Sequence, residues 1–142
     1  MNSESIGFIG IGNVGSNLAN NLLKSNNNVF VYDKNKKSYS RLKKLKNKPC
    51  KTLDELVEKS NIIITCLPSS IAVKNVLETL LKYLTKNGSF VCKFFRNSLE
   101  KTILQNIKQR FSLVKIYKPD SSRKDSKEIY LIAIGFNNLH KD

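Results

Sequence analysis

Short apolar segments alternate with longer amphipathic segments along the chain. The apolar segments are rich in Ile, Val and Phe and end at Gly, Pro or Asp, which is typical of buried strands. We expect strands at Ile6–Ile11, Val29–Tyr32, Ile62–Leu67, Ser89–Phe95, Leu113–Tyr117 and Ile129–Phe136, with a further short strand near Cys50. Strands that alternate with helices in this way predict an α/β protein.

The amphipathic segments carry apolar residues at the three- and four-residue spacing of a helix. We expect helices at Val14–Lys24, Lys36–Leu45 and Leu53–Lys59, another from Ser69 or Ser70 to about Tyr83, and a last one at Leu99–Arg110. Thr52 and Glu55 form the pattern of a capping box at the start of the third helix. In the fourth helix we expect six residues to face inward, namely Ile71, Val73, Val76, Leu77, Leu80 and Leu81.

The length of 142 residues suits a single domain. We predict one Rossmann-like domain over residues 1–142, with a mostly parallel sheet and helices on both faces. No apolar run reaches the roughly 20 residues of a membrane-spanning helix, and the first residues lack the pattern of a secretory signal. The cysteines Cys50, Cys66 and Cys92 cannot all pair and lack metal-ligand spacing. We therefore expect a cytoplasmic protein with no metal site and no membrane partner.

A glycine-rich motif, GxGxxG, follows the first predicted strand and opens the first predicted helix. Its residues are Gly10, Ile11, Gly12, Asn13, Val14 and Gly15. In this context the first glycine permits a tight turn, the second lets a pyrophosphate approach the backbone, and the third lets the helix pack closely on the strand. The N–H groups and the positive dipole end of the helix then face the phosphates. The motif predicts a dinucleotide site.

An acidic residue, Asp33, ends the second predicted strand 23 residues after Gly10. A carboxylate at this place accepts hydrogen bonds from a ribose 2′-hydroxyl, which favours NAD. Three nearby lysines, Lys34, Lys36 and Lys37, could instead meet the 2′-phosphate of NADP. Both nicotinamide dinucleotides therefore stay open as the cofactor.

Residues 6–80 resemble the cofactor domain of the β-hydroxyacid dehydrogenases, the family of 3-hydroxyisobutyrate and 6-phosphogluconate dehydrogenases. The resemblance lies in IGFIGIGNVGSNLANNLL, VFVYDKN, TLDELVEKSNIIITCLP and AVKNVL. It implies that residues 10 and 12–15 hold the pyrophosphate and that Leu67 and Pro68 form the turn beside the nicotinamide. The family's substrate-contacting Ser/Thr pair is absent, because the matching stretch reads Cys92-Lys93-Phe94-Phe95. Its catalytic lysine belongs to a helical domain that has no counterpart here.

The charge of the chain is strongly basic, with 25 Lys and Arg against 11 Asp and Glu and a net charge of +14. Such a charge is typical of nucleic-acid-binding proteins. However, 21 of the basic residues are Lys and the chain has 17 Asn. Because both residues have A-rich codons, an AT-rich genome would produce the same bias, so composition leaves RNA binding open. Residues 81–142 carry the denser positive charge.

Residues from about 81 to 138 resemble the C-terminal part of FtsJ-type ribosomal RNA 2′-O-methyltransferases. The matching stretches are NGSFVCKFF, LVKIYKP and KPDSSRKDSKEIYLIAIG. The resemblance implies an antiparallel C-terminal edge strand, and it matches Lys93 and Glu128 to two of four catalytic residues. The family's aspartate has no counterpart, since the fourth strand ends Thr65-Cys66-Leu67-Pro68. Its other lysine and its S-adenosylmethionine loop also have none, because the matching part of this chain is dehydrogenase-like.

Two functions follow from this division of the chain into a dinucleotide-binding half (1–80) and a methyltransferase-like half (81–142). The intact glycine motif favours an NAD(P)-binding module without complete catalytic machinery. The alternative is a methyltransferase fragment or fusion that uses S-adenosylmethionine and binds RNA. For the alternative we expect phosphate contacts from a basic cluster: Lys93, Lys115, Lys118, Arg123, Lys124 and Lys127.

Overall fold

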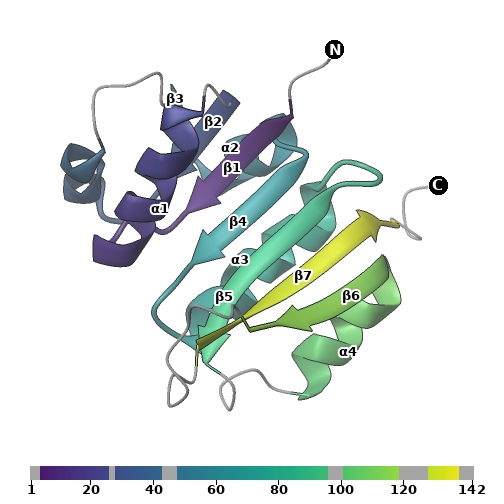
Figure 1. Ribbon diagram of the computed structural model, residues 1–142. Helices are drawn as coiled ribbons and strands as arrows, with labels where there is room; N and C mark the ends of the chain where they lie inside the picture. The colour runs from purple at the N-terminus through teal and green to yellow at the C-terminus, as the bar shows by residue number, and fades with distance from the viewer. Residues whose placement is uncertain (1–3, 26–27, 43–47, 96–100, 119–127, 138–142) are drawn as a thin grey trace.

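The protein, described by a computed structural model over residues 4–25, 28–42, 48–95, 101–118 and 128–137, is built on one seven-stranded sheet (Figure 1). The order of the strands is β3-β2-β1-β4-β5-β7-β6. Their bounds are β1 Ser5–Ile9, β2 Asn28–Tyr32, β3 Lys48–Pro49, β4 Ile62–Cys66, β5 Ser89–Phe95, β6 Phe111–Tyr117 and β7 Glu128–Phe136. The predicted α/β fold class is confirmed, and residues of both predicted halves share the sheet.

Strands β3, β2, β1, β4 and β5 are parallel, whereas β7 runs antiparallel to both of its neighbours, β5 and β6. The last strand is therefore antiparallel, as the sequence implies. It lies one place in from the edge, because β6 occupies the edge position. The first five strands follow the order of a dinucleotide-binding fold, in which β1 and β4 flank the point where the strand order reverses.

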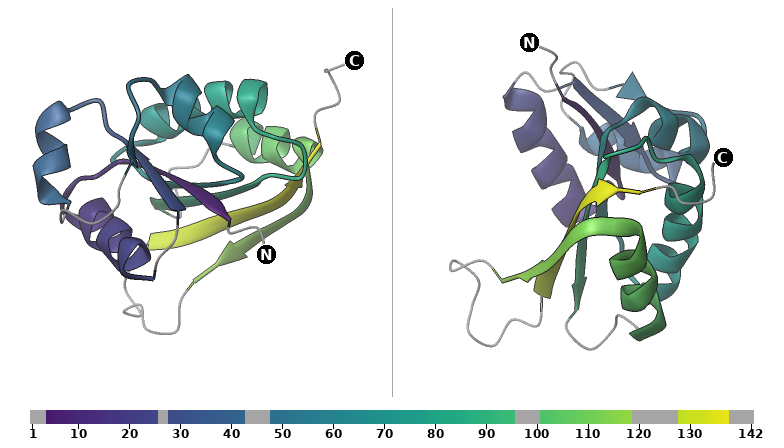
Figure 2. Two further views of the ribbon diagram at one scale, coloured as in Figure 1. Left: turned by 90° about the horizontal axis from the view of Figure 1, so that it is seen from above. Right: turned by 90° about the vertical axis from the view of Figure 1, so that its right-hand side faces the viewer.

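Helices cover the two faces of the sheet unequally (Figure 2). One face carries α1 (Asn13–Lys24), and the other carries α2 (Leu53–Lys59), α3 (Ser70–Tyr83) and α4 (Lys101–Arg110). A 3₁₀ helix, η1 (Lys36–Arg41), follows β2. No helix of the described residues is long and apolar enough to cross a membrane.

Each face of the sheet has its own hydrophobic core, because side chains alternate between the faces along a strand. Under α1, the core consists of Ile6, Phe8, Ile11, Ala19, Leu23, Val29, Val31 and Leu42. The larger core on the opposite face includes Ile9 and Ile63 and joins α2, α3 and α4 to β5 and β7. The core under α1 ends near β4, so the same face of β5, β7 and β6 has no helix over it among the described residues (Figure 1).

The capping signals in the sequence act as predicted. Thr52 Oγ1 accepts a hydrogen bond from the backbone N–H of Glu55 (3.1 Å), and Glu55 Oε2 accepts one from the backbone N–H of Lys51 (3.0 Å). Ser69, rather than Ser70, caps α3 by accepting from the backbone N–H of Ala72 (3.2 Å). Both helices therefore begin where local sequence signals place them.

Two local predictions are wrong. The segment predicted as a helix at Lys36–Leu45 forms the 3₁₀ helix η1, which ends at Arg41, and residues 43–47 lie outside the described part of the chain. Ile71, predicted to face inward, is 72% exposed. At 3.6 residues per turn Ile71 lies roughly opposite Val73 and Leu80 around the helix axis, so these residues cannot share a buried face. Ile71 is a surface residue of α3.

Candidate functional site

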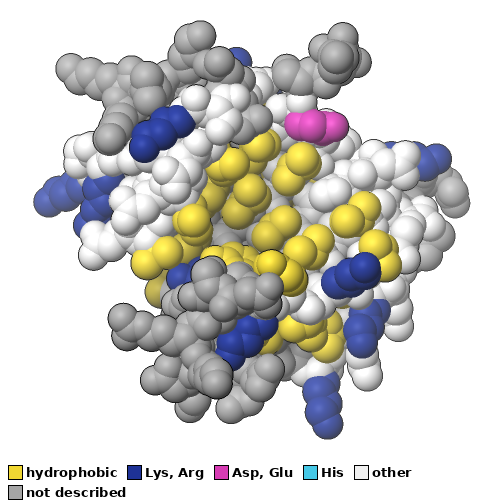
Figure 3. Space-filling model, in the orientation of Figure 1, with side chains coloured by type: hydrophobic (Ala, Val, Ile, Leu, Met, Phe, Trp, Pro, Cys, Tyr) yellow, Lys and Arg dark blue, Asp and Glu magenta, His cyan; other side chains and the backbone are white. Residues whose placement is uncertain are grey.

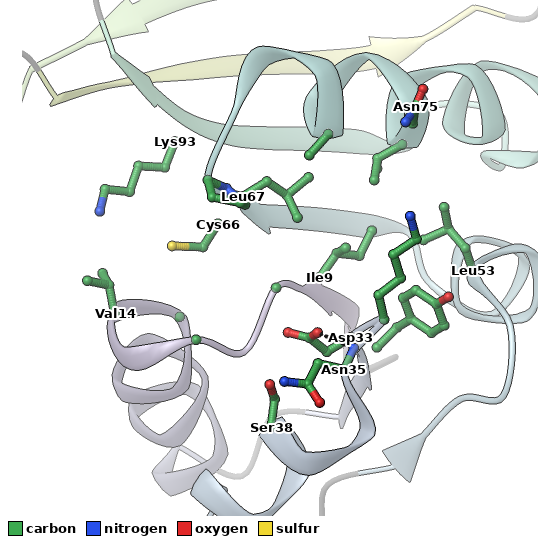
Figure 4. A pocket seen from close by; sticks show the side chains of 18 of the residues that line it. Ile9, Val14, Asp33, Asn35, Ser38, Leu53, Cys66, Leu67, Asn75 and Lys93 are labelled. Carbon is green, nitrogen blue, oxygen red and sulfur yellow. Dashed lines mark hydrogen bonds between the residues drawn. The ribbon is translucent and has the colours of Figure 1, made fainter.

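A cavity of about 670 Å³ lies at the carboxyl ends of the parallel strands. Its walls come from the loop after β1, the end of β2, the turn after β4 and the end of β5 (Figure 4). Open α/β sheets bind ligands in this place, outside the carboxyl ends of the strands at the point where the strand order reverses. The position of the cavity therefore makes it the candidate cofactor cleft.

The three glycines of the motif have different surroundings. Gly10 has a φ of +94°, and a Cβ there would collide with the backbone oxygen of Cys66. A Cβ on Gly15 would collide with the backbone oxygen of Gly10. At Gly12, by contrast, a Cβ would meet nothing within 4 Å. Gly10 and Gly15 are thus required by the packing of the chain itself, whereas Gly12 keeps open a space that faces the cleft.

The N-terminus of α1 opens into this space without a side-chain cap from its N-cap residue. Gly12 is the N-cap and makes no side-chain hydrogen bond, and the first turn contains no acidic residue. The first N–H groups of a helix need partners and carry partial positive charge, so they attract anions. An external phosphate group fits this end of α1, both in space and in charge.

Asp33 is held beside the glycine loop by two backbone hydrogen bonds. Its Oδ2 accepts from the N–H of Ile11 (2.8 Å), and its Oδ1 accepts from the N–H of Asn35 (2.8 Å). The N–H of Asp33 itself donates to the hydroxyl of Tyr39 (3.1 Å), and burial raises the pKa of that tyrosine. Each carboxylate oxygen has further acceptor capacity, so Asp33 can still receive a hydroxyl group from the cleft.

The structure brings most of the predicted cofactor residues to the cleft. Those that line it are Gly10, Gly12, Val14, Gly15, Asp33, Leu67 and Pro68. Ile11 and Asn13 do not line it: Ile11 is fully buried in the core under α1 and gives its N–H to Asp33, while Asn13 is exposed. Four of the six motif residues therefore line the cleft.

The three lysines near Asp33 differ in their position relative to the cleft. Lys34 lines the cleft, whereas Lys36 and Lys37 lie exposed on η1 and do not line it. Arg41, at the end of η1, donates to the backbone oxygen of Ile11 (3.5 Å). One lysine, Lys34, and one carboxylate, Asp33, therefore lie at the β2 end of the cleft.

The opposite end of the cleft is formed by β4 and β5. Cys66 and Lys93 are register partners on these strands, and both line the cavity. Lys93 extends past Cys66 toward the N-terminal end of α1, where Val14 lies (Figure 4). Glu128 opens β7, where its backbone pairs with Phe95, but its side chain lies outside the described part. Arg123, Lys124 and Lys127 also lie outside it.

Sequence reasoning missed several lining residues that come from the second face of the sheet. They include Leu53 at the start of α2 and Ala72, Asn75 and Val76 of α3. Only the three-dimensional arrangement brings these helix positions to the cleft, so no local motif marks them. Asn35 and Ser38, which also line it, follow Asp33 closely in sequence and could have been included on that ground.

The cysteines around the site differ in burial. Burial raises the pKa of Cys92 to about 11, so its thiol stays protonated and unreactive at neutral pH. Cys66 lies on the cleft wall and is partly exposed. Among the described residues, no group of three or more His, Cys, Asp and Glu side chains could hold a metal ion.

Comparisons with known proteins find relatives in two groups. The NAD binding domain of 6-phosphogluconate dehydrogenase matches residues 5–104. A probable mitochondrial 3-hydroxyisobutyrate dehydrogenase of Dictyostelium discoideum is 39% identical over 88 residues, which are 62% of this chain and 26% of that protein. The ribosomal RNA large subunit methyltransferase E of Ehrlichia ruminantium is 40% identical over 80 residues, 56% of this chain and 57% of that protein. Both predicted resemblances are confirmed.

A solved structure of a ribosomal RNA methyltransferase from Plasmodium falciparum has the same fold. The TM-score is 0.63 at 18% identity, over 96% of this chain and 88% of that one. The chain spans less than two thirds of the length of each of the two curated relatives. The Rossmann-like fold of this chain is therefore also found in a ribosomal RNA methyltransferase.

Proposed function

The chain belongs to the family of the NAD binding domain of 6-phosphogluconate dehydrogenase, and on that premise we propose that its cleft binds NAD or NADP with the pyrophosphate at the N-terminus of α1. The observation that carries this proposal is the open space at Gly12 beside an uncapped helix end. A Cβ at this position would fill the space that the pyrophosphate needs, whereas the neighbouring glycines serve the packing of the chain.

The rest of the cleft accommodates the remainder of a dinucleotide. Asp33 would accept hydrogen bonds from the adenosine ribose at the β2 end. Lys34, the next residue, also lines the cleft and would meet the 2′-phosphate of NADP. Leu67 and Pro68, which follow β4, would border the nicotinamide half. When bound, the dinucleotide supplies hydride-transfer chemistry; the chain's own residues bind and orient it.

We propose binding without independent turnover. A hydride-transfer enzyme must hold its substrate against the nicotinamide, and the Ser/Thr pair that does so in the dehydrogenases is replaced here by Phe94 and Phe95. The aspartate that FtsJ-type methyltransferases have at the end of the corresponding strand is replaced here by Cys66, the last residue of β4. We further propose that residues 1–142 act as one domain, because β1 to β7 share one sheet.

Isothermal titration of the purified protein with NAD, NADP and S-adenosylmethionine tests the proposal. We expect saturable binding of at least one dinucleotide and weaker or no binding of S-adenosylmethionine. Asp33→Ala should weaken the binding of NAD more than that of NADP. The carboxylate that it removes accepts a hydrogen bond from the ribose 2′-hydroxyl of NAD but repels the 2′-phosphate of NADP. Tight binding of S-adenosylmethionine with no response to either dinucleotide would contradict the proposal and favour the methyltransferase alternative.

A second candidate function, RNA binding, is favoured by the uncovered face of the sheet. Tyr130 on β7 pairs in register with Lys93 on β5 and with Tyr117 on β6, so the three side chains lie in one row on one face. Lys115 belongs to the same face and is exposed. Figure 3 shows this face as a band of hydrophobic side chains with basic side chains around it.

Exposed aromatic rings on a sheet can stack on unpaired bases while lysines contact the phosphates. Tyr117 is 52% exposed and therefore accessible to a base. Filter binding of single-stranded RNA at two salt concentrations tests this candidate. We expect affinity to fall steeply between low and physiological salt and to weaken further in Tyr117→Ala. Affinity that is independent of salt would contradict phosphate contacts.

A further inference from the structure

Strand β6 forms one edge of the sheet. In the order β3-β2-β1-β4-β5-β7-β6 it is the last strand, and among the described residues only β7 pairs with it. Figure 1 shows β6 at this edge, next to α4. It has seven residues, whereas β3 at the other edge has two. An edge strand of this length presents a row of backbone N–H and C=O groups with which an extended chain can pair.

The exposed apolar side chains of β6 lie on both of its faces. Leu113 and Tyr117 lie on the uncovered face of the sheet and are 44% and 52% exposed. Ile116, whose register partner on β7 is the buried Leu131, lies on the opposite face and is 56% exposed. A strand added to the edge alternates its side chains between the two faces, so it would cover exposed groups on both. A base stacked on Tyr117 would cover only one face.

The segment that forms this edge is basic throughout. Residues 101–118, which span α4 and β6, contain five Lys and Arg and no Asp or Glu. Lys101, Lys108 and Lys115 are exposed, and no carboxylate within the described ranges forms an ion pair with any of the three. Self-pairing of two copies at this edge would bring like charges together and is therefore disfavoured. A partner with carboxylates beside its apolar residues would instead complement the lysines.

We propose that β6 is a docking edge for an extended acidic segment of another protein, which adds one strand to the seven of the sheet. Main-chain hydrogen bonds would align the segment with β6, and its apolar residues would pack beside Leu113, Ile116 and Tyr117. Its carboxylates would pair with Lys115 and with the lysines of α4. Because a lysine within an edge strand opposes pairing with strands that bring no carboxylate, Lys115 makes the edge selective. No residue of β6 lines the cofactor cleft, so the two sites are separate.

Fluorescence anisotropy of the full chain with labelled synthetic peptides tests the proposal. The probe is a peptide in which Val and Glu alternate, and the wild type should bind it saturably. Two control peptides should show no binding at the same concentrations. One has Lys in place of Glu, and the other is polyglutamate, which has the charge but not the apolar residues of the probe. Binding of the Val/Glu peptide should weaken as the salt concentration rises, because the paired charges are exposed to solvent.

Substitutions on β6 separate pairing at the edge from general attraction of charge. Ile116→Ser should weaken binding of the Val/Glu peptide by about 5-fold. Lys115→Glu should weaken it by about 10-fold and should permit binding of the Val/Lys peptide. Lys74→Glu, an equal change of charge at an exposed position of α3, is the matched control and should change the affinity for the Val/Glu peptide by less than about 2-fold. Circular dichroism shows whether each variant keeps the fold.

Three results would overturn the proposal. The first is the absence of saturable binding of the Val/Glu peptide by the wild type, or equal affinities of the wild type, Ile116→Ser and Lys115→Glu for it. The second is equally tight binding of polyglutamate, because charge alone would then account for the attraction. The third concerns RNA, which would contact Tyr117 on the uncovered face but not Ile116. If Ile116→Ser weakened binding of single-stranded RNA and left that of the peptide unchanged, the edge would belong to an RNA site.

Discussion

The N-termini of α1 and α2 show two ways in which one chain begins a helix. At α2, Thr52 caps the helix and Asp54 and Glu55 place negative charge in the first turn. At α1, a glycine stands at the N-cap and the first turn contains no acidic residue. Both helices follow a strand or loop of the same sheet, and both carry the same partial positive charge at this end. The chain satisfies that charge itself at α2, whereas at α1 neither an N-cap side chain nor an acidic residue of the first turn does so.

This difference teaches how to separate a structural helix end from a binding site. A cap that is supplied by the chain stabilises the fold and closes the end to outside anions. An uncapped end without acidic residues costs some stability, which a bound anion recovers. The glycine motif therefore points to function because of both what it contains and what it leaves out.

The largest expected effect comes from making α1 resemble α2. Gly12→Asp would supply an N-cap carboxylate in the space that is open at Gly12, where the backbone is extended, as an N-cap requires. We expect dinucleotide affinity to fall by about 100-fold or more, since the carboxylate occupies the site of the pyrophosphate and repels it at close range. The melting temperature should stay the same or rise. Calorimetric titration and thermal unfolding measure the two effects.

Gly12→Ala separates space from charge in the same experiment. It adds only a methyl group, so a smaller loss of affinity than in Gly12→Asp is expected, again with an unchanged melting temperature. If Gly12→Asp bound NADH as tightly as the wild type, the pyrophosphate would lie elsewhere.

The next largest expected effect is a loss of stability in a variant of Gly15. A Cβ at Gly15 would collide with the backbone oxygen of Gly10, so Gly15→Ala must displace α1 or the loop. We expect the free energy of unfolding to fall by about 2 kcal/mol, the usual cost of overpacking. Urea denaturation followed by circular dichroism measures it. An unchanged unfolding midpoint would contradict the close packing of α1 on the loop.

A smaller effect is expected at the capped helix. Thr52→Ala removes the hydrogen bond to the N–H of Glu55 and should lower the free energy of unfolding by about 1 kcal/mol. Dinucleotide affinity should not change, because Thr52 does not line the cleft. The same urea and calorimetric measurements apply, and a loss of affinity in this variant would show that the two helix ends are coupled.

The smallest effect is a pH dependence at α2. Hydrogen bonding to Lys59, at 2.9 Å, and to the N–H of Lys51 lowers the pKa of Glu55 from its ordinary value of 4.5. A carboxyl group with a lowered folded pKa stabilises the fold above its ordinary pKa and loses that contribution as the pH falls through the folded value. Stability should therefore drop slightly on acidification below about 4.5, and Glu55→Gln should reduce this drop. Melting temperatures between pH 6 and pH 3 test it.

Local signals in the sequence were sufficient for much of the fold and for half of the site. The Thr52–Glu55 capping box depends on contacts between residues close in the chain, so its geometry follows from its spacing. The glycine motif is recognised from its spacing between a strand and a helix. Apolar character alone predicts an inward-facing Ile71, whereas the angle of this residue around the helix axis places it on the surface. The 3₁₀ type of the helix at Lys36–Arg41 is not predictable from the sequence, because the spacing of apolar residues in this basic segment suits either helix type.

The remaining half of the site depends on tertiary structure. Asn75 of α3 and Leu53 of α2 reach the cleft from the face opposite α1, and no local pattern marks them. The sequence marks Lys93 only through its likeness to a methyltransferase residue, and its place in the cleft follows from the pairing of β4 with β5. The hydrogen bond from Ile11 to Asp33 also joins residues that are 22 positions apart in sequence.

The most direct test of the dinucleotide site is a two-dimensional amide NMR titration of the isotope-labelled protein with NADH. The account predicts that the largest shifts occur at the backbone amides of residues 12–15, where the helix end meets the pyrophosphate, with further shifts near Asp33 and Lys93. The amides around Thr52 at the capped end of α2 should move little. Shifts confined to other parts of the sheet, or none at saturating NADH, would contradict the account.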